Sequence, residues 1–168
     1  MIQTPRVPSP TRGPAHAGRA LEALVDAGGP TRARWILSQR LRETPDDHSL
    51  WAALAFAWFE DGRLEPSLDA VERAQAAAPA CGLVRFYRAN VLAALGQTAP
   101  ARALFRSLVE AGEGHLSTGS CSVEREQARK MIHRSQVWLE LDARCAARMP
   151  EPLLRLGLPA RVREPQMN

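Results

Sequence analysis

The chain has 168 residues and a mass of 18.4 kDa, which suits one ordinary domain or a small array of repeats. Apolar residues make up 45% of it, enough for a packed core, while an aromatic content of only 5% favours closely packed helices over the interior of a sheet. The net charge of +4 describes a mildly basic surface, and no stretch approaches the roughly 18 apolar residues of a membrane span. We therefore expect a soluble all-α protein.

The N-terminal segment MIQTPRVPSPTRG is rich in proline and has no apolar run of the kind found in a signal peptide. We expect residues 1–13 to form a disordered tail. The three cysteines, Cys81, Cys121 and Cys145, are odd in number and lack a CxxC pair, which is typical of a reducing compartment. Lys130 is the one lysine among 22 basic residues, and the excess of arginine and alanine indicates GC-rich codon usage. These features predict a cytoplasmic protein from a bacterium.

One sequence interval, a period of about 34 residues, repeats through the middle of the chain. Glycine, proline and small or apolar residues all recur at this interval: Gly28, Gly62 and Gly96; Pro45 and Pro79; Pro66 and Pro100; Ala33, Ser67 and Ala101; Leu37, Val71 and Phe105. Each unit has the pattern of an apolar helix ended by glycine, a second helix opened by proline or a small residue, and a proline stop. The period predicts helical hairpins at 14–47, 48–81 and 82–115. Their helices are expected at 15–26, 31–43, 48–60, 65–77, 82–95 and 99–111.

These units resemble the tetratricopeptide repeat (TPR) family over about 102 of the 168 residues. The middle unit carries the fullest match, at Trp51, Leu54, Ala55, Trp58, Ser67, Val71, Ala74 and Pro79. The third unit keeps Ala89, Leu92, Gly96, Ala101, Phe105 and Leu108, but has Arg85 and Arg88 at two apolar positions. The first unit keeps only the small and aliphatic positions. The resemblance implies a right-handed stack of hairpins, a TPR-like α-solenoid, and the alternative is an antiparallel helical bundle with alanine-rich seams.

The first helix of the middle unit has two apolar faces. The face that contains Trp51 and Trp58 suits packing within the stack, whereas the face of Ala52, Phe56 and Phe59 needs another partner. In the TPR family the first helix of each unit lines a concave groove. The resemblance therefore implies a groove for an extended peptide, in which Asn90 hydrogen-bonds the peptide backbone. The expected groove residues are Ala52, Phe56, Phe59, Glu60, Leu83, Phe86, Asn90 and Ala93.

The glycine-rich segment from Gly112 to Ser122 is the main candidate for chemistry. Gly114 and Gly119 have the spacing of a phosphate-binding loop, but Ser120 stands where the lysine should be. Ser122 suits a helix N-cap, and acidic residues follow it at the helix start, where a bound anion would lie. His115, Cys121, His133 and Cys145 form no close pair that presets a metal or thiol site. We expect a structural loop and no catalysis, cofactor or metal, with an enzyme or metal site at 112–122 as the less favoured alternative.

Residues 123–148 have the pattern of one long helix. Its expected inner face contains Ala128, Met131, Ile132, Ser135, Trp138, Leu139 and Cys145. Because a repeat array needs a cap over its last apolar face, residues 116–149 are predicted to be a loop and a capping helix that packs on 99–111. The tail at 150–168 begins with PEPLLRLGLP, whose leucines provide a candidate occupant of the groove. An open groove and a groove filled by this tail remain alternatives.

Arginines cluster on the predicted helix 31–43, at Arg32, Arg34, Arg40 and Arg42. Acidic residues follow at once, so we expect a solvated face rather than a nucleic-acid site. The pairs Asp46–Asp47 and Glu60–Asp61 are interpreted as solvated helix-end residues. The sequence thus predicts a non-catalytic adaptor that binds a peptide or a partner protein in its groove, in the cytoplasm and away from membranes. The alternative is a small TPR-type chaperone of a bacterial secretion system, which would have similar size and architecture.

Overall fold

The computed structural model describes residues 28–118 and 123–148. The predicted tails 1–13 and 150–168, the predicted helix 15–26 and the loop residues 119–122 lie outside the described residues. Within 28–118 and 123–148 every regular element is a helix, which confirms the all-α prediction. The helices are α2 (Gly29–Glu43), α3 (His48–Glu60), α4 (Leu64–Ala77), α5 (Gly82–Ala94), α6 (Thr98–Thr118) and α7 (Arg125–Arg148).

The helix bounds follow the period of the sequence. The helices α3 and α5 begin one period apart, and so do α4 and α6. The end of α3 is closed by Gly62 in the left-handed conformation, with φ of +70°. The Gly62 N–H donates to Phe59 O (2.9 Å) and the Arg63 N–H to Trp58 O (3.0 Å), which is the Schellman pattern. The end of α5 repeats both bonds around Gly96, so two successive turns have one geometry.

The first glycine of the series behaves differently. Gly28 lies before α2 with an extended φ of 169°, and its neighbour Gly29 takes the left-handed conformation, with φ of +74°. The left-handed residue of this turn is therefore Gly29, one position after the glycine that keeps the 34-residue interval. Because two glycines stand together there, either one can adopt the conformation that a Cβ would strain.

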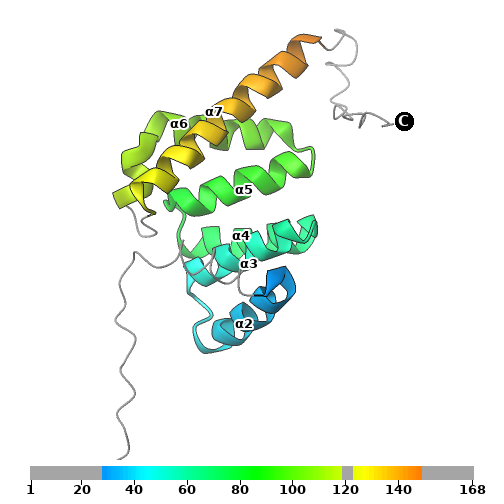
Figure 1. Cartoon of the computed structure of the whole chain (residues 1–168), viewed down its shortest axis with the longest axis vertical. Helices are drawn as coiled ribbons and strands as arrows, with labels where there is room; N and C mark the ends of the chain where they lie inside the picture. Colours follow the sequence, from blue (N-terminus) through cyan, green and yellow to red (C-terminus); the bar gives the residue numbers. More distant parts are fainter. Residues whose placement is uncertain (1–27, 119–122, 149–168) are drawn as a thin grey trace, which may run out of the picture.

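The helices pack in chain order. Each helix contacts the next one along the chain, and α3 also contacts α5. Figure 1 shows this order along the length of the molecule, from α2 to α6 and α7. Small residues at equivalent positions let the helices approach closely, since Ala33, Ser67 and Ala101 are at most 1% exposed. The buried Ser67 hydroxyl donates to Ala55 O (2.7 Å), which joins α4 to α3.

The last long helix, α7, packs against α6 as expected. Four residues of its predicted inner face are buried, namely Ala128, Met131, Ile132 and Ser135. Cys145, by contrast, is exposed. The inner face continues through Asp142 instead, because the Asp142 carboxylate pairs with Arg102 of α6.

The C-terminal part of α6 occupies a segment that was expected to be a loop. Gly112, with φ of +74°, ends the regular part of α6, and residues 113–118 then form a further helical stretch. Leu116 in this stretch is buried against Gly82 at the start of α5, and His115 Nε2 lies 3.2 Å from Ala80 O. The prediction of a loop over all of 112–122 is therefore wrong for 113–118, where apolar burial of Leu116 favours a helix.

The arginine cluster on α2 is not uniformly solvated. The Arg34 side chain is 13% exposed and pairs with Asp61 at the end of α3. Asp61 follows α3 as its C-cap, and Asp47 precedes α3 as its N-cap, so both are helix-end residues as predicted. The expectation of a solvated face is wrong for Arg34, because the ring of Trp58 and the Asp61 carboxylate together cover its guanidinium.

Candidate binding groove

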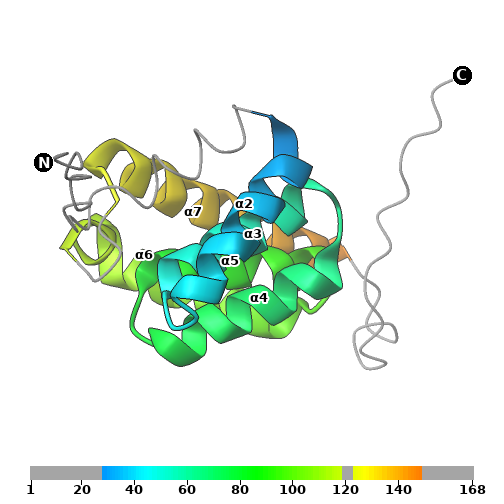
Figure 2. The ribbon, with the colours of Figure 1, turned by 90° about the horizontal axis from the view of Figure 1, so that it is seen from below.

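One groove of about 640 Å³ lies between α3, α5 and α7. In the view from below (Figure 2), α7 lies on one side of α3 and α5, and α4 lies on the other. The groove therefore opens on the side of α3 and α5 away from α4. Its lining is mostly apolar and is formed by Ala55, Phe56, Phe59, Glu60, Phe86, Tyr87, Asn90, Val91, Gln127, Lys130, Met131, His133, Arg134, Val137, Trp138 and Leu141.

A chain of aromatic contacts runs beneath the groove from α3 to α7. The ring centroids of Phe56 and Tyr87 are 5.5 Å apart, and those of Tyr87 and Phe86 are 6.0 Å apart. Phe86 then contacts Phe105 of α6 at 6.4 Å, and Phe105 contacts Trp138 of α7 at 4.8 Å. Such tilted and edge contacts are the favoured arrangements of aromatic pairs. The rings of Phe56, Phe86, Tyr87 and Trp138 therefore form the floor of the groove. The buried Phe105 of α6 lies between Phe86 and Trp138 and so connects α5 to α7.

The expected groove residues separate into two groups. Five of them line the groove: Phe56, Phe59, Glu60, Phe86 and Asn90. The other three lie elsewhere: Ala52 and Leu83 are 0% and 1% exposed in the core, and Ala93 is packed against it. The assignment of Ala52 and Leu83 to the groove surface is wrong, because the neighbouring helices cover that part of α3 and α5.

Asn90 has already used one of the two N–H donors of its side-chain amide. Its Nδ2 donates to Phe86 O within the same helix at 2.7 Å. That leaves Oδ1 and one N–H of the Asn90 amide for a bound ligand. The structure thus reduces the capacity for backbone recognition that the sequence suggested for this residue.

Half of the lining comes from α7, which the sequence pattern predicted only as a cap. Lys130, Arg134, Val137 and Leu141 follow one another on a single stripe of the helix, each about one turn from the next. Two of these residues are apolar and exposed, with Val137 at 40% and Leu141 at 52%. Val137 and Leu141 lie beside the predicted inner face, and these two apolar residues were the sequence feature that could have indicated this wall. Tyr87 of α5 was missed as well.

The alternative of a chemical site gains no support from the described residues. Within 28–118 and 123–148, no group of three or more His, Cys, Asp and Glu side chains could hold a metal ion. Cys81 is buried at the start of α5, Cys145 is exposed on α7, and Cys121 lies outside the described residues. The glycine-rich segment 112–122 is likewise described only as far as residue 118.

The chain matches no protein-family model, no curated protein and no solved structure. Among the helices that the structure describes, none has the length and apolarity that crossing a membrane requires. The function must therefore be inferred from the repeat and from the residues of the groove.

Proposed function

We propose that the chain is a TPR-like α-solenoid, a right-handed stack of helical hairpins. In this arrangement α3–α4 and α5–α6 are two complete hairpins, and α2 is the second helix of the hairpin before them. The proposal is supported by the spacing of the helix starts, which repeats with the period of the sequence, and by the matching turns at Gly62 and Gly96. The helix α7 covers α6 as a cap and at the same time extends the groove-lining surface beyond α5.

We further propose that the chain is a non-catalytic interaction module that binds a peptide or protein segment in its groove. The observation that carries this proposal is the exposed apolar pair Val137 and Leu141 beside Phe56 and Phe59 in one hollow. Apolar side chains that converge on an open groove are typical of a surface that a partner covers. The charged residues at its edge, such as Glu60, match the polar rim of an interface.

A peptide-display selection tests this function. A library of random peptides, each about 16 residues and so long enough for four helical turns, is selected on the full chain. The recovered peptides are then measured against Val137→Asp/Leu141→Asp. Because both side chains are exposed, this variant should keep the helical circular dichroism while the affinity falls at least about tenfold. The matched control is Trp35→Asp on α2, since Trp35 is 66% exposed outside the groove and should leave the affinity unchanged.

Two results would contradict the proposal. One is a selection that recovers no peptide on the full chain. The other is a set of peptides that bind Val137→Asp/Leu141→Asp as tightly as the unchanged chain, which would place the interaction surface elsewhere.

A further inference from the structure

We infer that the groove takes an amphipathic α-helix with an acidic flank rather than an extended peptide. This inference rests on the proposed function and specifies the partner of the same site. Three features of the groove carry it: the scarcity of hydrogen-bonding groups on the floor, the spacing of the apolar anchors, and the uneven charge of the walls.

The floor offers little to an extended backbone. An extended segment presents N–H and C=O groups along its whole length, and each one that is buried without a partner is unfavourable. The floor consists mainly of aromatic rings, and one of the two N–H donors of the Asn90 amide is already bonded to Phe86 O. A helix satisfies its backbone groups internally and presents only side chains to such a surface.

The anchors have helical spacing. Val137 and Leu141 are one turn apart on α7, and Phe56 and Phe59 are about one turn apart on α3. A ligand helix that lies between these walls, above Tyr87, can place apolar residues at i, i+3 or i+4, and i+7 against both of them. The three helices and the ligand would then pack as neighbours in a helical bundle.

The walls differ in charge. The α7 wall carries the cations Lys130 and Arg134, whereas the α3 wall carries the acid Glu60. Lys130 pairs with Glu126 at 2.7 Å, but the two side chains are 71% and 76% exposed, so this pair competes weakly with a ligand carboxylate. The complementary ligand has acidic residues on the flank that lies along α7 and none on the flank near Glu60.

Charge also argues against the chain's own C-terminal segment as the occupant. The segment 150–168 contains Arg155, Arg161 and Arg163 but only two acidic side chains, Glu151 and Glu164. Its leucines could supply apolar anchors, but its arginines would lie against the cationic wall that contains Arg134. An acidic helix from a partner protein matches that wall better.

Three synthetic peptides, each about 18 residues or five helical turns long, test the inference on the full chain by fluorescence anisotropy. All carry leucines at helical anchor spacing; the first has glutamates on one flank, the second has lysines there, and the third is the glutamate peptide with a central proline. The glutamate peptide should bind about tenfold tighter than the lysine peptide. The proline should weaken binding by about tenfold or more, because it breaks the helix.

Charge reversal on α7 provides the matched test. Lys130→Glu/Arg134→Glu should invert the preference, so that the lysine peptide becomes the tighter ligand. The control Arg144→Glu/Arg148→Glu makes the same change in net charge on α7 outside the groove lining and should keep the original preference. A preference that survives in the first variant, or that inverts in the control, would overturn the inference.

The failure of this inference is distinguishable from the failure of the proposed function. If the peptides bind equally with either flank or with the proline, and Val137→Asp/Leu141→Asp still abolishes binding, the groove binds peptides without a preference for acidic helices. If Leu153→Asp/Leu154→Asp in the full chain raises the affinity of all three peptides about tenfold, the chain's own tail occupies the groove. If the unchanged chain sediments as a dimer that Val137→Asp/Leu141→Asp dissociates, the occupant is a second copy. Each of these results overturns the acidic helix.

Discussion

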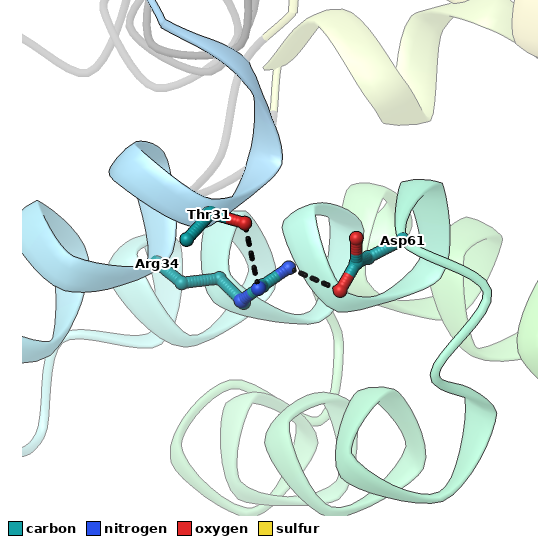
Figure 3. Close-up of polar contacts among 3 residues, drawn as sticks. All are labelled: Thr31, Arg34 and Asp61. Atoms are coloured by element: carbon teal, nitrogen blue, oxygen red, sulfur yellow. Dashed lines mark hydrogen bonds and ion pairs between the residues drawn. The ribbon is translucent and has the colours of Figure 1, made fainter.

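Arg34 of α2 lies against Asp61 at the end of α3, with Nη1 2.7 Å from Oδ2 (Figure 3). The contact is an ion pair without the alignment of a hydrogen bond. The Nη2 atom of the same guanidinium donates to Thr31 Oγ1 (3.0 Å), and its central carbon lies 4.3 Å from the centroid of the Trp58 ring. The ion pair and the cation–π contact thus join α2 to α3, while the hydrogen bond to Thr31 stays within α2.

An equivalent pair occurs two periods later in the chain. Arg102 stands two periods after Arg34, and it pairs with Asp142 on the next helix, α7. The hydrogen bond to Asp142 raises the pKa of Arg102. Each arginine therefore links a second helix of the repeat to the helix that follows it. This parallel supports the proposal that α7 covers α6 as a cap.

The pair of Arg34 and Asp61 should show measurable coupling in a double-mutant cycle. We expect Arg34→Met to lower the free energy of unfolding by about 1–2 kcal/mol, because it removes the charge contact and the contact with Trp58. Asp61→Asn should cost less, and the coupling should be about 0.5–1 kcal/mol in urea denaturation. The exposed pair Lys130 and Glu126 is the control, for which we expect no resolvable coupling. If the cycle of Arg34 and Asp61 also shows no resolvable coupling, their ion pair does not stabilise the fold.

The turn at Gly62 gives a second prediction. Its φ of +70° is unfavourable for a residue with a Cβ, although no atom lies within 4 Å of the position that a Cβ would take. Gly62→Ala should therefore cost about 1–2 kcal/mol through backbone strain alone. Gly114→Ala is the matched control, since its Cβ also meets open space, and it should leave the thermal midpoint unchanged or slightly higher. If Gly62→Ala and Gly114→Ala change the stability equally, the positive φ at position 62 does not strain a residue with a Cβ.

Much of the fold could be predicted from the spacing of particular residues. Glycine at the end of α3 and of α5 sets the helix bounds, and small residues such as Ser67 mark where helices meet. These are local requirements of backbone conformation and volume, so they are visible in a single sequence. The helical turn around Leu116 was missed because its stability comes from tertiary burial against Gly82, which no local pattern shows.

The groove could be predicted only in part. Phe56 and Phe59 were found because they form an apolar face without a partner on one helix. Ala52 belongs to the same face but is covered by the neighbouring helices, which depends on packing angles. The wall with Val137 and Leu141 was missed because its place in the groove depends on how α7 crosses α5 and α6, a relation between distant parts of the chain.

The contact of Leu116 with Gly82 yields a third prediction. A Cβ at position 82 would lie 2.6 Å from Leu116 Cδ2 and 3.3 Å from His115 Cδ2. Because Leu116 is buried, it cannot move aside freely, and Gly82→Ala should cost about 1–3 kcal/mol. The double variant Gly82→Ala/Leu116→Ala should lose less free energy of unfolding than the sum of the losses in the two single variants. Strict additivity in chemical denaturation would show that the segment 113–118 does not pack on α5.

The N-cap of α3 makes stability depend on pH. Asp47 Oδ1 accepts hydrogen bonds from the Ser49 N–H (2.9 Å) and the Leu50 N–H (3.4 Å), and from the Ser49 hydroxyl. Partial burial opposes ionisation of Asp47, but these hydrogen bonds outweigh it and hold its pKa below the ordinary value of 3.8. The charged cap therefore stabilises the fold fully above that value, and its contribution is lost as the pH falls through the lower pKa of the folded state.

Asp47→Ala should thus lower the free energy of unfolding by about 1 kcal/mol at neutral pH, which urea denaturation measures. The difference from the unchanged chain should stay constant down to about pH 4 and shrink below it, as the unfolded and then the folded carboxylate becomes protonated. Asp47→Asn separates geometry from charge, because its amide oxygen still accepts the bond from Ser49 while carrying no titratable group. A difference between Asp47→Ala and the unchanged chain that grows toward acid would mean that the pKa of Asp47 is raised, and that burial outweighs the cap.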